Sequence, residues 1–156
     1  MRAYIIPMTP KRIKLLLGRK IKKEVKTFCP ITTESFKVYV YCPIRRCDSK
    51  REHMIMSRDS DGEYDNWKGK VIAEFVCDEL KPVPQLPSLK FFEETRLTPE
   101  EYETYRRKQR SLMKTLRVTQ LKEYAVGKPL SDFKNDLGNP VSVITGTFTK
   151  VKEVAE

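Results

Sequence analysis

Hydrophobic and polar positions alternate along several segments of the chain, which predicts a β-rich fold with few helices. The clearest alternation is FKVYVY over 36–41, where Phe36, Val38 and Val40 share one face of the expected strand. The segment KVIAEFVC over 70–77 is apolar at nearly every position, which indicates a central, buried strand. Further strands are expected over the ranges 3–6, 25–29, 116–124 and 141–151.

Two segments carry helix signals instead. Thr9 is a typical N-cap with proline after it, apolar residues follow at helical spacing, and Gly18 is a typical helix stop. On this short helix we expect Arg12 to face water with the neighbouring lysines. A second helix, over 98–116, begins with a capping box, and a short helical turn is expected near Ser131.

Together these elements predict an α+β fold, a small and partly open β-barrel flanked by two or three helices. The length of 156 residues favours a single domain over 1–156. The polar stretch near 43–67 is expected to be a long loop or protruding hairpin within it. Because no apolar run is long enough to span a bilayer or to form a secretory signal, we expect a soluble, cytoplasmic protein with no membrane partner.

Charge changes this picture, because the positive excess lies in one part of the chain. Residues 1–50 hold 13 Lys/Arg against three Asp/Glu, which accounts for the whole net charge of +10, and the run GRKIKKEVK over 18–26 is the densest part. A charge confined to one segment favours a polyanionic partner, with nucleic acid as the first candidate and an anionic membrane surface as the second. Lysines would contact phosphates, and aromatic rings on the other face of the 36–41 strand would stack on bases. The candidate binding residues are Arg19, Lys20, Lys22, Lys23, Glu24, Lys26, Tyr39 and Tyr41.

Each of these features also has an interpretation without a ligand. The lysine-rich run would be a solvated face, Tyr39 and Tyr41 would pack against the long helix, and Glu24 would form a surface ion pair. A third alternative is an acidic protein partner that docks on the basic face.

Metal, cofactor and several enzyme classes are not expected. Cys42, Cys47 and His53 lie near one another, but their spacing matches no common zinc site. Three of the four cysteines lie in or beside apolar runs, which is typical of small buried side chains in a reducing compartment. A single histidine excludes nuclease chemistry by a histidine pair, and the chain has no Gly-rich phosphate loop or GxSxG motif.

Four segments, in order, resemble one family: LLLGRKIKKEVKTFCP, FKVYVYCP, GKVIAEFVCDEL and LRVTQLKEYAVGKPLSDF. They are similar to the ASCH domains, PUA-like β-barrel proteins common in bacteria and their phages, and the resemblance spans roughly 1–135. It implies a barrel with a cleft beside it that holds RNA or a nucleotide. The signature residues that line this cleft fall on Lys20, Glu24 and Lys26, although one extra residue before the glutamate leaves Lys22 and Lys23 as alternatives for the lysine.

The resemblance also implies an alternative activity. Some ASCH-like proteins hydrolyse an acylated nucleoside such as acetylcytidine, using a lysine, a threonine and a glutamate, for which the candidates here are Lys20 and Glu24. The chain departs from that pattern because Lys23 occupies the position of the threonine, three residues after Lys20. The signature arginine is replaced by Lys26, which keeps the charge but loses the bidentate fork of a guanidinium.

Overall fold

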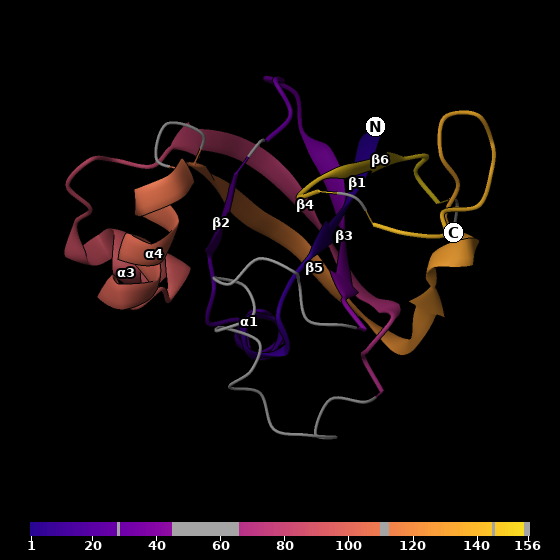
Figure 1. The fold of residues 1–156 in the computed structure, drawn as a ribbon, viewed down its shortest axis with the longest axis horizontal. Helices are drawn as coiled ribbons and strands as arrows, with labels where there is room; N and C mark the ends of the chain where they lie inside the picture. The colour runs from indigo at the N-terminus through magenta and orange to yellow at the C-terminus, as the bar shows by residue number, and fades with distance from the viewer. Residues whose placement is uncertain (28, 45–65, 110–112, 145, 155–156) are drawn as a thin grey trace.

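A curved, six-stranded sheet forms the centre of the molecule in the computed structural model, which describes residues 1–27, 29–44, 66–109, 113–144 and 146–154 (Figure 1). The strand order is β2-β5-β4-β3-β1-β6. The strands are β1 (Arg2–Pro7), β2 (Lys23–Thr27), β3 (Phe36–Cys42), β4 (Lys70–Pro82), β5 (Met113–Pro129) and β6 (Thr149–Val151). The β1–β3 pair is parallel and the other pairs are antiparallel.

The sheet curves toward a barrel without closing, since β2 and β6 remain its two edges. Register shifts along β4 and β5, and a positive φ of 51° at Gln120, mark the bulges that bend the two longest strands. Side chains tie the β2 edge to the other side: Thr147 Oγ1 donates to the Thr27 carbonyl at 2.6 Å, and Lys26 Nζ donates to the Pro7 carbonyl. The expected α+β, partly open architecture is confirmed.

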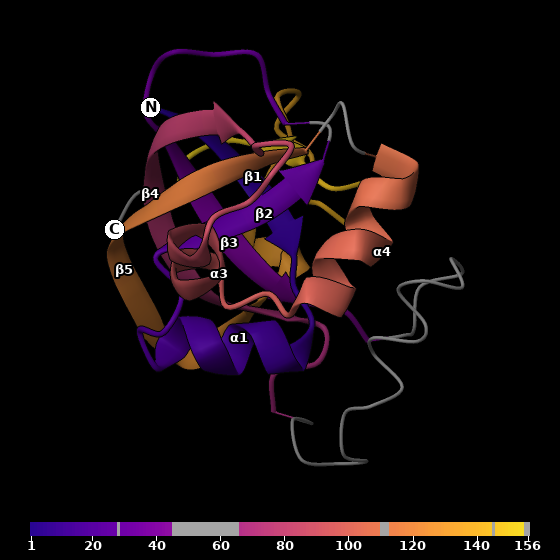
Figure 2. The same ribbon diagram turned by 90° about the vertical axis from the view of Figure 1, so that its left-hand side faces the viewer.

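Three α-helices flank this sheet in the part of the chain that is described: α1 (Pro10–Leu17), α3 (Leu89–Thr95) and α4 (Pro99–Gln109) (Figure 2). Thr9 Oγ1 accepts from the Arg12 N–H, as its N-cap position predicts. The capping box of α4 is also present, because Thr98 and Glu101 exchange side chain–backbone hydrogen bonds of 3.1 Å in both directions. No helix among the described residues is long and apolar enough to cross a membrane.

Alternate residues of the central strands build two apolar clusters on opposite faces. On β3, Val38 and Val40 point to the larger cluster with the apolar side of α1, while Tyr39 and Tyr41 point to a second cluster beneath the C-terminal segment. A third cluster joins β2 and β5 to α3 and α4 through Val25, Met113 and other side chains. This third cluster places the two helices beside the β2 edge.

Several expected elements differ from the structure. The helix expected over 98–116 ends at Gln109, and residues from Met113 onward are strand, because pairing with β2 and β4 overrides their helical spacing. The strand expected over 141–151 is present only as β6, since Gly146 has a positive φ of 80° that interrupts extended backbone. Helix α3 has no counterpart among the expected elements. Most of the polar stretch 43–67 lies outside the described residues.

Candidate functional site

The basic run begins where α1 ends, and backbone hydrogen bonds hold it in place. The N–H of Arg19 donates to the Leu16 carbonyl at 3.0 Å and that of Lys20 to the Leu15 carbonyl at 2.9 Å, which together form a Schellman motif. Gly18 was expected at the left-handed position of this stop. Instead Gly18 has φ −75° and Arg19 takes the left-handed conformation with φ 58°. An arginine there is unusual, since the conformation favours glycine.

Four cations at and after the last turn of α1 are exposed and pair with no described carboxylate. We call them the α1 basic segment: Lys14, Arg19, Lys20 and Lys22. The backbone of Lys22 is fixed on both sides, because its N–H donates to the Glu94 carbonyl at 2.8 Å and its carbonyl accepts from Val118 at 2.9 Å. The base of each side chain is therefore positioned while its charged end is free to contact a ligand.

The remaining predicted cations are engaged elsewhere. Lys23 lies 3.6 Å from Glu94 of α3, and Lys26 Nζ donates to the Pro7 carbonyl. Neighbouring residues of a strand point to opposite faces, so Lys23 and Glu24 point away from each other. Of the predicted cations on β2, only Lys26 shares a face with Glu24. The structure thus divides the predicted cluster into three parts. Arg19, Lys20 and Lys22 are exposed after α1. Lys23 lies beside α3, and Glu24 and Lys26 share the opposite face of β2.

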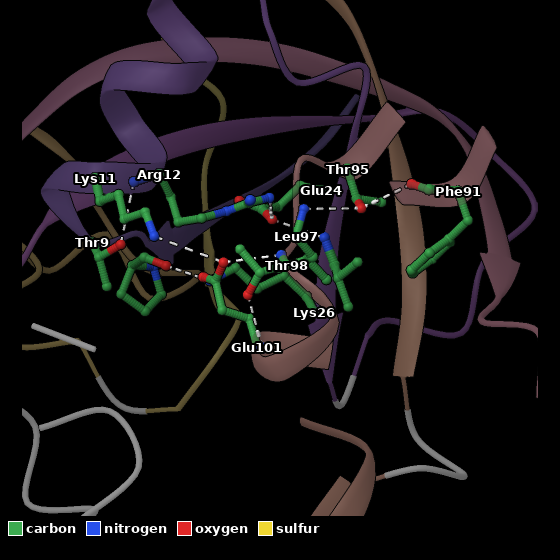
Figure 3. Close-up of polar contacts among 12 residues, drawn as sticks. Thr9, Lys11, Arg12, Glu24, Lys26, Phe91, Thr95, Leu97, Thr98 and Glu101 are labelled. Atoms are coloured by element: carbon green, nitrogen blue, oxygen red, sulfur yellow. Dashed lines mark hydrogen bonds and ion pairs between the residues drawn. The ribbon is translucent and has the colours of Figure 1, made fainter. Parts of the chain in front are cut away.

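Glu24 forms a buried ion pair with a residue that the sequence analysis had placed in water. Arg12 Nη2 donates to Glu24 Oε1 at 2.7 Å, and the two residues are only 5% and 3% exposed. Figure 3 shows these side chains, from α1 and β2, pointing toward one another. The same Oε1 accepts the Val25 N–H at 2.8 Å. The surface ion pair expected for Glu24 does not describe this buried contact.

One nitrogen of this pair lacks a partner. Arg12 Nη1 is buried and makes no hydrogen bond with the described residues. Burial alone would lower the pKa of Arg12, but the charge and hydrogen bond of Glu24 outweigh it and hold the pKa above its ordinary value. The side chain therefore remains a cation. Its position four residues before Leu16, on the apolar side of α1, is the signal that could have predicted its burial.

Tyr39 and Tyr41 were expected to stack on bases, but the structure buries both rings. They are 1% and 8% exposed, and Tyr39 packs on Phe133 with ring centroids 4.8 Å apart. The Tyr39 hydroxyl also accepts the Val154 N–H at 2.8 Å. The face away from the larger cluster is covered by the C-terminal segment, so neither ring offers an open surface to a base. Packing against the long helix, the other expectation, is also wrong, since the apolar cluster around both rings holds no described residue of α4.

The hydrolase candidates do not meet. Lys20 is exposed in the loop after α1, whereas Glu24 is buried against Arg12, and no contact joins them. Glu74 on β4 is a second buried carboxylate, and it accepts hydrogen bonds from Lys37 Nζ at 2.7 Å and from the Tyr124 hydroxyl at 2.9 Å. The hydrogen bond to Glu74 raises the pKa of Lys37, which makes this amine a poorer nucleophile at neutral pH.

The described cysteines are not reactive groups. Burial raises the pKa of Cys29 and of Cys77 to about 11, which keeps both thiols protonated. Cys42 is buried in β3 as expected for a small apolar side chain. Cys47 and His53 lie outside the described residues.

No protein-family model matches the chain, and no curated protein matches it in sequence. Its fold is similar to that of ZmASCH from Zymomonas mobilis, solved as a serine-to-alanine mutant, with a TM-score of 0.56 and 13% sequence identity. The match covers 82% of this chain and 74% of that one. This likeness confirms the ASCH fold that the sequence resemblance predicts.

Proposed function

We propose that this protein binds single-stranded nucleic acid, RNA in the first instance, and that the α1 basic segment supplies the phosphate contacts. The observation that carries the proposal is the set of four exposed cations without a described carboxylate partner, in the part of the chain that holds the whole positive excess. Phosphates require such cations, and an ion pair already formed within the protein weakens the attraction.

The geometry also favours this segment over the rest of the predicted cluster. Lys23 already has Glu94 as a neighbour, and Lys26 donates across the open edge of the sheet. Arg19, Lys20 and Lys22 instead extend from backbone that hydrogen bonds hold in place. Less backbone motion is lost when a positioned cation binds a phosphate, which favours binding at this segment.

The test compares two triple variants that lose the same charge. One replaces Arg19, Lys20 and Lys22 by glutamine. The control replaces Lys90, Lys134 and Lys152, which are also exposed and pair with no described carboxylate. Three lost phosphate contacts at a slope of about 0.7 each amount to roughly a 100-fold loss of affinity at 0.1 M salt.

Binding to a labelled, short single-stranded RNA is measured by fluorescence anisotropy. We expect the loss in the first variant and little change in the control. An equal loss in both would mean that net charge alone attracts RNA, and would contradict the proposal. Absence of RNA binding by the unmodified protein, with capture of an acidic protein after nuclease treatment, would favour the protein-partner alternative.

A further inference from the structure

We propose that Arg12 and Glu24 together bind the hydrogen-bonding edge of one nucleobase, at the open edge of the sheet between α1 and β2. This inference rests on the proposed function, which supplies the strand that carries the base. It concerns a different part of the protein from the α1 basic segment. It also concerns a different part of the nucleic acid, since the base is uncharged whereas the sugar–phosphate backbone is charged.

The first argument is the unpartnered nitrogen. A buried donor without a hydrogen bond costs about 1–3 kcal/mol, so native proteins rarely retain one without a reason. Arg12 Nη1 is such a donor, on a side chain that is 5% exposed and fixed through Nη2 by Glu24. The guanidinium is thus oriented before any ligand arrives, with its second amino group still available.

The second argument is the unused oxygen beside it. Both hydrogen bonds of Glu24, from Arg12 and from the Val25 N–H, end on Oε1. No described residue donates to Oε2. The pair therefore offers one donor, on Arg12, and one acceptor, on Glu24, and a nucleobase edge presents the complementary acceptor and donor side by side.

Charge decides between a base and a phosphate. The charges of Arg12 and Glu24 cancel, and a phosphate at Nη1 would lie beside the Glu24 carboxylate, which repels it. An uncharged base meets no such repulsion. Specific recognition of single-stranded RNA uses bases turned out of the strand and bonded on their edges, which matches this pair in kind.

A base would reach the buried pair by displacing the side chains beside it. Lys11 lies 3.8 Å from Glu101 of α4, close to Arg12, and the Lys11 side chain is 45% exposed (Figure 3). Lys26 lies two residues along β2 on the same face as Glu24. Both side chains are long and unbranched, and their contacts, with Glu101 and with the Pro7 carbonyl, would have to break.

The first experiment follows the arginine side-chain nitrogens by NMR while single compounds are added. The four uncharged nucleosides carry a base without phosphate, and ribose 5-phosphate carries phosphate without a base. We expect the Nη signals of Arg12 to shift with at least one nucleoside and not with ribose 5-phosphate. A shift with ribose 5-phosphate alone would identify an anion site, and no shift with any compound would leave only a water partner; either result overturns the proposal.

The second experiment compares an RNA with an abasic strand of the same length. We expect the intact protein to favour the RNA about tenfold, and Arg12→Lys, which keeps the charge but lacks the second amino group, to lose that preference. Thermal unfolding shows whether this variant folds. Glu24→Gln is the second variant: its amide oxygen can still accept from Arg12, its amide nitrogen donates where Oε2 accepted, and the order of preference among the four bases should change.

The abasic strand separates the two proposals. If it binds and its affinity depends on Arg19, Lys20 and Lys22, but bases add nothing in the intact protein, only the base site fails. If the abasic strand does not bind, the phosphate contacts of the proposed function fail. A purely structural Arg12 would leave the ratio of the two affinities unchanged in every folded variant, which would also overturn the base site.

Discussion

Replacing Arg19 by glycine should stabilise the protein and weaken RNA binding at the same time. Arg19 occupies the left-handed position of the α1 stop with φ 58°. A residue with a Cβ atom pays about 1–2 kcal/mol for this conformation, and glycine has almost no such cost. Glycine also gives the unfolded chain more freedom, which takes back about 0.4–1 kcal/mol. The net gain in the free energy of unfolding is therefore about 0.5–1 kcal/mol.

Two further variants isolate the causes. Arg19→Ala removes the same charge but keeps the strained backbone, so it should lose the same RNA affinity without the gain in stability. Arg96→Gly is the matched control, because Arg96 follows α3 with φ 56° and belongs to no proposed contact. It should gain stability and keep its affinity for RNA.

Urea unfolding followed by circular dichroism measures the stability, and anisotropy with a single-stranded RNA measures the affinity. A gain of this size corresponds to a rise of about 2–3 °C in Tm for a chain of this length. If Arg19→Gly is less stable than Arg19→Ala, the conformation costs nothing and the reasoning is refuted. If both Arg19 variants keep full affinity for RNA, the strain has no connection with binding.

Two other predictions concern buried groups. Glu24→Leu should lower the free energy of unfolding by about 3–5 kcal/mol, because it leaves the Arg12 charge buried alone. Arg12→Met combined with Glu24→Leu should recover most of that loss. Urea unfolding of the single and double variants checks this, and additive losses would contradict it. In a Cys47→Ser variant, the thiols of Cys29 and Cys77, with pKa values of about 11, should react with iodoacetamide about a hundredfold more slowly at neutral pH than a free cysteine, and equal rates would contradict their burial.

Local patterns predicted the elements whose signals lie within a few residues. The Thr9 cap, the alternation in β3 and the apolar run in β4 all depend on short-range spacing, and all are present. The end of α4 was placed too late, because the residues from Met113 onward become strand through their pairing with β2 and β4. That pairing joins segments far apart in the chain, which spacing within one segment does not reveal.

The candidate site was predicted in part for the same reason. Charge along the chain located the α1 basic segment, but Lys23 and Lys26 were grouped with it, although strand geometry and long-range partners separate them. Arg12 was missed because a charged residue on a short helix is ordinarily solvated, and only the position of Glu24 on β2 provides a buried partner. Tyr39 and Tyr41 are covered by a C-terminal segment whose place no local pattern indicates.

The salt dependence of RNA binding tests the central claim most directly. If Lys14, Arg19, Lys20 and Lys22 each contact one phosphate of a single strand, the logarithm of the association constant should fall with the logarithm of salt concentration with a slope of about −3. The variant that lacks Arg19, Lys20 and Lys22 should retain a slope of about −0.7. The same slope in both proteins would show that the α1 basic segment does not contact the strand.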